Sequence, residues 1–175
     1  MKRIKITINL CTGCNQCVLT CAFSKTSVFD ITQSNIKIVQ WEDLCLSVPL
    51  VCRQCSDAPC IDVCPSTAIA FGETTGAIQF DLDLCSSCGM CVEACRYQVI
   101  HFNHKGNPET CDFCNGDPKC VQSCFPGALK FEDCADQVEP LANIAEALIE
   151  RLNGGLEPPP ASLIDMAILP PYFPK

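Results

Sequence analysis

Apolar residues recur mostly in short runs with a period of two, a pattern that predicts β-strands. One run covers residues 4–8, where isoleucines alternate with polar residues, and another covers residues 36–41. Residues 65–81 read as a proline, a short apolar run, a turn bounded by glycines and a returning run in which Ile78 and Phe80 alternate with polar residues. This order predicts a β-hairpin, and a further strand is expected at residues 127–131.

The C-terminal part of the chain has a different pattern. Between residues 137 and 152 apolar residues follow helical spacing, and Gly154 and Gly155 end the predicted helix. Three prolines at 158–160 precede an apolar stretch at 163–173. A proline-rich segment stays extended, so we expect residues 155–175 to form an arm that lies on a partner protein, with folding back over the chain's own body as the alternative.

Composition changes the picture because 18 of the 175 residues are cysteines. Sixteen of them form four quartets, and each quartet ends in Cys-x3-Cys. The first and third quartets have identical spacing, whereas the second and fourth have a few more residues between their second and third cysteines. The quartets are Cys11, Cys14, Cys17 and Cys21; Cys52, Cys55, Cys60 and Cys64; Cys85, Cys88, Cys91 and Cys95; and Cys111, Cys114, Cys120 and Cys124.

Disulfides, structural zinc and iron–sulfur clusters are the three uses of cysteine to compare. The N-terminus has no long apolar run and no small-residue cleavage site, so we expect a cytoplasmic protein with reduced thiols. No window approaches the roughly 20 apolar residues of a membrane span, so direct membrane insertion is not expected. Structural zinc sites usually pair two separated knuckles. Runs of three cysteines with a fourth one helical turn later are typical of 4Fe-4S ferredoxins.

The linkers indicate which quartets belong together. The predicted hairpin joins the second and third quartets into an inner ferredoxin unit at about residues 52–95. The first and fourth quartets then form an outer unit, from residues 1–51 and 96–135. The expected fold class is therefore α+β, with two nested bacterial-ferredoxin-like (βαβ)2 units in residues 1–135, a C-terminal helix at 136–154 and the extended tail.

Ligand sets follow from the spacing. A Cys-x2-Cys-x2-Cys loop wraps one cluster, and the fourth cysteine, one helical turn later, ligates the neighbouring cluster about 10 to 12 Å away. Four 4Fe-4S clusters are expected, or three if one of the looser quartets is empty. The predicted sets are Cys11, Cys14, Cys17 and Cys124 (site A); Cys21, Cys111, Cys114 and Cys120 (site B); Cys52, Cys55, Cys60 and Cys95 (site C); and Cys64, Cys85, Cys88 and Cys91 (site D).

The remaining residues offer no other chemistry. Net charge is −8, which argues against nucleic acid as a partner. No phosphate loop, nucleophile–base pair or flavin motif is present, so we expect an electron carrier without catalytic residues of its own. Cys45 and Cys134 are expected to be buried free thiols, with spare ligands or redox sensors as alternatives. His101 and His104 are expected to be inert surface residues, and Trp41 to shield the outer clusters.

Over residues 4 to about 131, the four quartets resemble the four-cluster electron-transfer subunits of molybdenum and tungsten oxidoreductases, such as the B subunit of dimethyl sulfoxide reductase. The fourth motif of that family often carries a long insertion, whereas only five residues separate Cys114 from Cys120. The short fourth motif is similar to that of small subunits of tungsten aldehyde oxidoreductase-type enzymes, including class II benzoyl-coenzyme A reductases. Residues 21–24, 28–29 and 34–38 resemble the same group.

The resemblance implies a subunit of anaerobic metabolism that relays electrons between a tungsten-pterin or molybdenum catalytic subunit and further redox subunits. A free soluble polyferredoxin is the alternative within redox function. A zinc-stapled structural module is the alternative of another class.

Overall fold

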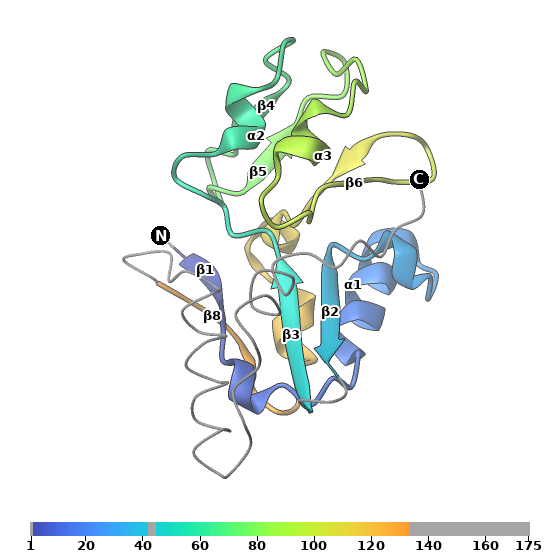
Figure 1. Cartoon of the computed structure of the whole chain (residues 1–175), viewed down its shortest axis with the longest axis vertical. Coiled ribbons are helices and arrows are strands. Elements are labelled where there is room, and N and C mark those ends of the chain that lie inside the picture. Colours follow the sequence, from blue (N-terminus) through green and yellow to red (C-terminus); the bar gives the residue numbers. More distant parts are fainter. Residues whose placement is uncertain (1, 42–44, 134–175) are drawn as a thin grey trace. The chain divides into compact units, whose positions relative to one another are not determined.

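The computed structural model describes residues 2–41 and 45–133. The predicted C-terminal helix, the apolar arm and Cys134 therefore lie outside the described residues. The described part is a small mixed structure of short helices and two-stranded antiparallel sheets (Figure 1).

The described residues contain four short α-helices and three 3-10 helices. They are α1 (Gln16–Thr26), α2 (Pro59–Asp62), α3 (Met90–Ala94), α4 (Lys119–Gln122), η1 (Ile8–Leu10), η2 (Ile31–Gln33) and η4 (Phe113–Gly116). The strands are β1 (Lys2–Ile6), β2 (Ile36–Trp41), β3 (Leu46–Val51), β4 (Ile69–Phe71), β5 (Ile78–Phe80), β6 (His101–Phe102), β7 (Pro108–Glu109) and β8 (Leu129–Asp133). They pair as β1–β8, β2–β3, β4–β5 and β6–β7.

The sheet β1–β8 joins segments from the two ends of the described chain, with Ile6 opposite Leu129. The prediction of a strand at 4–8 is wrong at its C-terminal end, because the strand stops at Ile6. The N–H of Cys11 donates to the carbonyl of Ile8 at 2.9 Å, which closes a 3-10 turn ahead of the first cysteine loop. Strand β8, which pairs with β1, starts at Leu129, two residues later than predicted.

The other two predicted strand regions are confirmed. Strand β2 covers residues 36–41, although the Trp41 side chain lies outside the described residues. The partner strand β3 was not predicted from the sequence. It contains Pro49, and a proline weakens a strand prediction. In a two-stranded sheet each strand has a free edge, so a missing N–H is tolerated. Strands β4 and β5 form the expected hairpin, in which the N–H of Gly72 donates to the carbonyl of Ala77 at 2.7 Å.

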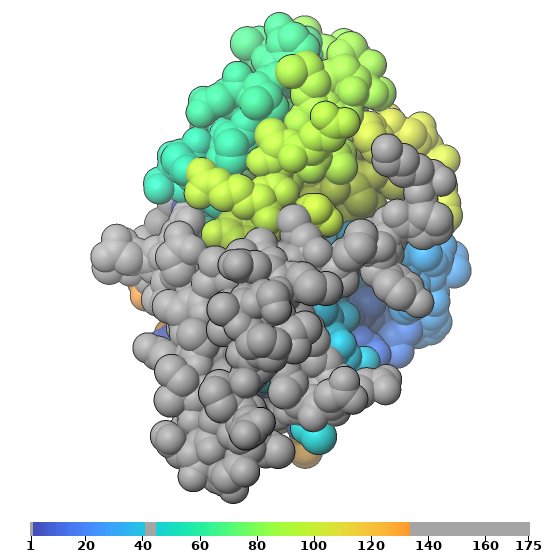
Figure 2. Space-filling model, in the orientation of Figure 1, coloured from blue at the N-terminus to red at the C-terminus, as the bar shows by residue number. Residues whose placement is uncertain are grey.

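Cysteines contribute a large share of the interior. One apolar cluster gathers around Phe113, and Cys17, Cys21, Cys111 and Cys120 belong to it. A second cluster gathers around Ile78 and includes Cys60 and Cys91. Helix α1 packs on α4, and α2 packs on α3 beside the β4–β5 hairpin (Figure 1). The surface of residues 52–110 appears teal to yellow in Figure 2.

Candidate iron–sulfur sites

The first cysteine loop is held by the β2–β3 hairpin. Gly13 has a φ of +69°, and the side-chain amide of Gln40 donates to its carbonyl at 3.3 Å. A Cβ at position 13 would collide with the side chains of Gln40 and Ser47. The loop is therefore pressed against the hairpin in a conformation that glycine adopts at low cost.

Three of the four predicted ligand sets each line one cavity. Around site A the cavity wall also includes Ile38, Pro49 and Leu129, so the thiols face a largely apolar space. The lining cysteines are Cys11, Cys14, Cys17 and Cys124 in one cavity; Cys52, Cys55, Cys60 and Cys95 in the second; and Cys64, Cys85, Cys88 and Cys91 in the third. The structure thus brings together cysteines that are up to 113 positions apart in the sequence.

The four site B thiols also influence one another. Burial, and then the thiols of Cys21 and Cys114, raises the pKa of Cys120 to about 12. Burial raises the pKa of Cys111 far above its ordinary value, and Cys120 and Cys21 add to the effect. Mutual repulsion of this kind requires that the thiolates lie close together. Cys17 of site A also acts on Cys120, and Cys52 of site C acts on Cys111, so the grouping of the four site B thiols stays a prediction.

The helices that carry the quartets differ in length. Helix α1 carries both Cys17 and Cys21 within one continuous helix. Helices α2, α3 and α4 have only one turn, and their quartets' fourth cysteines Cys64, Cys95 and Cys124 lie just beyond the last helical residue. At three of the four quartets the helix therefore ends before the fourth cysteine.

The buried cysteine thiols fit an iron–sulfur cluster, because its iron atoms supply positive charge. Burial raises the pKa of Cys17 and Cys52 to about 12 and that of Cys60 to about 11. Such thiols bind as thiolates when bound iron offsets the cost of burying charge. Within residues 2–41 and 45–133, no three His, Cys, Asp or Glu side chains converge closely enough to hold a single ion.

Two basic residues lie beside the thiols. Lys25 Nζ is 2.6 Å from Asp112 Oδ2. Burial alone would lower the pKa of Lys25, but Asp112, and then the Cys114 and Cys21 thiols, raise it overall. Arg96 is ion-paired with Asp57, and both influence the Cys55 thiol of site C. Sequence reasoning missed these bases, because only the folded chain shows which charges face a cysteine.

Three predictions about residues outside the quartets meet different outcomes. Cys45 is exposed rather than buried, because it stands at the turn into β3 with a φ of +47°. Both ring nitrogens of His101 are buried and have no hydrogen-bond partner among the described residues, so the expectation that it is a surface residue is wrong. Burial, and then the charge of Lys37, lowers the pKa of His101. His104 is exposed, as predicted.

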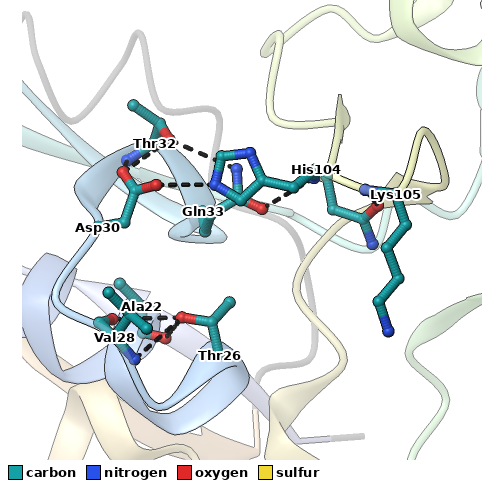
Figure 3. Close-up of polar contacts among 9 residues, drawn as sticks. Ala22, Thr26, Val28, Asp30, Thr32, Gln33, His104 and Lys105 are labelled. Carbon is teal, nitrogen blue, oxygen red and sulfur yellow. Dashed lines mark hydrogen bonds and ion pairs between the residues drawn. The ribbon is translucent and has the colours of Figure 1, made fainter.

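His104 is nevertheless not isolated. Its backbone N–H donates to Gln33 Oε1 at 3.2 Å, and its Nε2 lies 2.8 Å from Asp30 Oδ2 (Figure 3). Asp30 also accepts hydrogen bonds from the backbone N–H and the hydroxyl of Thr32. These contacts tie the β6–β7 turn to η2.

Comparison with known proteins gives a family. The model of the 4Fe-4S dicluster domain matches residues 44–134, which is more than half of the chain. The chain belongs to the 4Fe-4S dicluster domain family. The cofactor type predicted from the quartets is therefore confirmed, and the matched region accounts for two 4Fe-4S clusters.

Members of this family with related sequences are parts of redox enzymes. The chain is 37% identical over 122 residues to the polyferredoxin-like subunit of an aliphatic sulfonate oxidoreductase from Pyrococcus furiosus, covering 69% of this chain and 70% of the relative. It is 40% identical over 124 residues to the beta subunit of an NADH-dependent phenylglyoxylate dehydrogenase from Aromatoleum evansii, covering 69% of this chain but only 28% of that protein. The resemblance to iron–sulfur subunits of oxidoreductases is confirmed at this level.

Comparison with solved structures matches one chain along nearly its whole length. The BamBC active site complex of benzoyl coenzyme A reductase, as isolated, contains a chain with 20% sequence identity and a TM-score of 0.47, with coverage of 97% of this chain and 98% of that one. Among the described residues, no helix is both long and apolar enough to cross a membrane.

Proposed function

We propose that this chain is the iron–sulfur electron-transfer subunit of an oxidoreductase complex and holds four 4Fe-4S clusters in sites A to D. The observation that carries the proposal is that three separate cavities are each lined by one complete predicted set of four cysteines. Each bound cluster supplies the capacity to accept and return one electron. The chain's own part is to hold these groups close together in apolar surroundings.

We further propose that the fold is two nested ferredoxin-like units. The packing of α1 on α4 and of α2 on α3 supports this arrangement, because it pairs the first quartet with the fourth and the second with the third. The β4–β5 hairpin between the second and third quartets, and the β1–β8 pairing outside both, support it too.

The same arrangement suggests an order for the sites. Cys17 of site A and Cys21 of site B stand one turn apart on α1. Cys111 of site B and Cys52 of site C influence each other electrostatically. Sites C and D are adjacent as well, because each takes three cysteines from one of the second and third quartets and the fourth cysteine from the other. The order A–B–C–D follows, and it places the exposed Cys14 and Cys88 in the two terminal sites, where redox partners reach the chain.

The partner that we propose is a tungsten-pterin or molybdenum catalytic subunit in the cytoplasm, of the kind found in class II benzoyl-coenzyme A reductases, with further redox subunits at the other end. The short fourth quartet supports this, since it resembles the small subunits of tungsten aldehyde oxidoreductase-type enzymes. Substrate chemistry then belongs to the partner, and this chain relays electrons to or from it.

Anaerobic purification of the tagged full chain, with mass identification and metal analysis of what accompanies it, tests this function. We expect a subunit containing tungsten or molybdenum in stoichiometric amount. A version truncated after Gly155 is the matched comparison, because the proposed arm should be needed for that association. A fully iron-loaded chain that purifies alone would instead favour a free polyferredoxin.

A further inference from the structure

Gln54 lies inside the second cysteine loop, between Cys52 and Cys55, yet its side chain reaches the fourth quartet. Its Nε2 donates to the carbonyl of Cys111 at 2.7 Å. Its Oε1 accepts from the N–H of Ile78, also at 2.7 Å. The residue is completely buried, with 0% of its surface exposed. One amide group therefore links the site C loop, the first cysteine of site B and strand β5.

The backbone of the same residue also touches a thiol. Burial raises the pKa of Cys52 to about 12, and the backbone of Gln54 and the side chain of Thr110 act on the same thiol and partly offset the rise. Thr110 is buried and directly precedes Cys111 in the sequence. The thiol of Cys52 in turn influences that of Cys111. Sites B and C thus meet at one buried junction, consisting of Cys52, Gln54, Thr110 and Cys111.

The backbone conformation and hydrogen bonds of Gln54 are unusual for a residue that only fills space in the core. Gln54 adopts a φ of +52°, a conformation that costs free energy for any residue with a Cβ. A buried primary amide is expensive unless its polar atoms are satisfied, and here both side-chain bonds are short and both join groups from different quartets or strands. An apolar residue would fill the volume without joining the two ligand loops.

We propose that Gln54 is a positioning residue that fixes the relative placement of sites B and C and thereby the passage of electrons between them. This inference rests on the proposed function, since it requires clusters in both sites. One electron moves from one site to the other, so one site is oxidised as the other is reduced, and no bond or proton needs to move. Because the Cys111 carbonyl is fixed by the amide, its ligand loop cannot drift from that of Cys52.

The test compares the full chain with three variants, each first checked for iron and acid-labile sulfide. Gln54→Met keeps a similar volume and removes both side-chain bonds. Gln54→Glu keeps an acceptor for Ile78 but, when ionised, has no donor for Cys111. The matched control is Gln79→Met, because Gln79 is exposed on β5 next to Ile78. The measurements are redox titrations followed by electron paramagnetic resonance, and the rate of electron equilibration between sites after a reducing pulse.

We expect Gln54→Met to change the midpoint potentials of sites B and C, to weaken their spin–spin interaction and to slow electron equilibration between them. Sites A and D should keep their wild-type potentials, and the Gln79→Met control should match the wild type throughout. Gln54→Glu should show the same losses, with lower potentials at sites B and C because of its charge.

Two results would overturn the inference. One is an iron-loaded Gln54→Met protein whose potentials, spin–spin interaction and equilibration rate all match the wild type, even if it unfolds at a lower temperature. The other is loss of iron from both Gln54 variants, which would leave the residue a role in folding alone. A wild-type chain that lacks clusters in sites B and C would instead refute the proposed function.

Discussion

Lys25 offers a way to test how the protein sets the potential of site B. Its side chain is 23% exposed, and its ammonium group pairs with Asp112 at 2.6 Å. It stands four residues after Cys21 on α1, which places the two side chains roughly 6 Å apart. Reduction of a cluster adds negative charge, so a nearby cation raises its midpoint potential. Lys25→Gln should therefore lower the potential of site B.

The size of the effect follows from Coulomb's law. At about 6 Å, a unit charge contributes ~2.8 kcal/mol with an effective dielectric constant of about 20, and ~0.7 kcal/mol if the surroundings are as polar as water. For a one-electron couple, ~1.4 kcal/mol corresponds to about 59 mV. The expected decrease in midpoint potential is therefore about 30 to 120 mV. The Asp112 carboxylate, left without its cation, acts in the same direction.

The assay is a redox titration followed by electron paramagnetic resonance, with the site B signal identified as the one altered by Cys114→Ser. Lys5→Gln serves as the control, since it also breaks an ion pair, with Glu132 at 2.8 Å, but on the exposed β1–β8 sheet. An unchanged or raised site B potential in Lys25→Gln would refute the reasoning. A decrease of equal size in the Lys5→Gln control would do so as well.

Three further predictions concern other parts of the structure. Phe113→Ala should lower the free energy of unfolding by about 3 to 5 kcal/mol, because its fully buried ring leaves a cavity, and an unchanged denaturation midpoint would contradict this. Gly13→Ala should lose one cluster, about four irons per chain, since its Cβ collides with Gln40, whereas full iron content would count against that clash. Asp30→Ala should speed amide hydrogen exchange in the β6–β7 turn by removing the contact with His104, and unaltered exchange would show that the contact is unimportant.

Cysteine spacing predicts the candidate sites because the ligands of a cluster must follow its geometry, and the three cavities lined by complete cysteine sets support that prediction. A loop that wraps three thiols around one centre sets the positions of Cys11, Cys14 and Cys17 almost independently of the rest of the fold. The same argument paired the quartets, since a one-turn offset directs a cysteine such as Cys124 to the neighbouring site. Apolar alternation likewise found β2 and the β4–β5 hairpin.

The remaining features depend on contacts between distant segments. Strand β3 forms despite Pro49 because β2 supplies a partner, and no local preference shows this. Cys45 is exposed because it falls in a turn, whereas its residue type alone favours burial. The role proposed for Gln54 arises from the carbonyl of Cys111, 57 residues away, which sequence alone does not bring near.

The central claim is that this chain holds four 4Fe-4S clusters, and the most direct test is the content of iron and acid-labile sulfide per chain in anaerobically purified protein. Four cubanes predict about sixteen iron and about sixteen sulfide. About eight of each would limit the clusters to one ferredoxin unit. Little iron with stoichiometric zinc would contradict the account altogether.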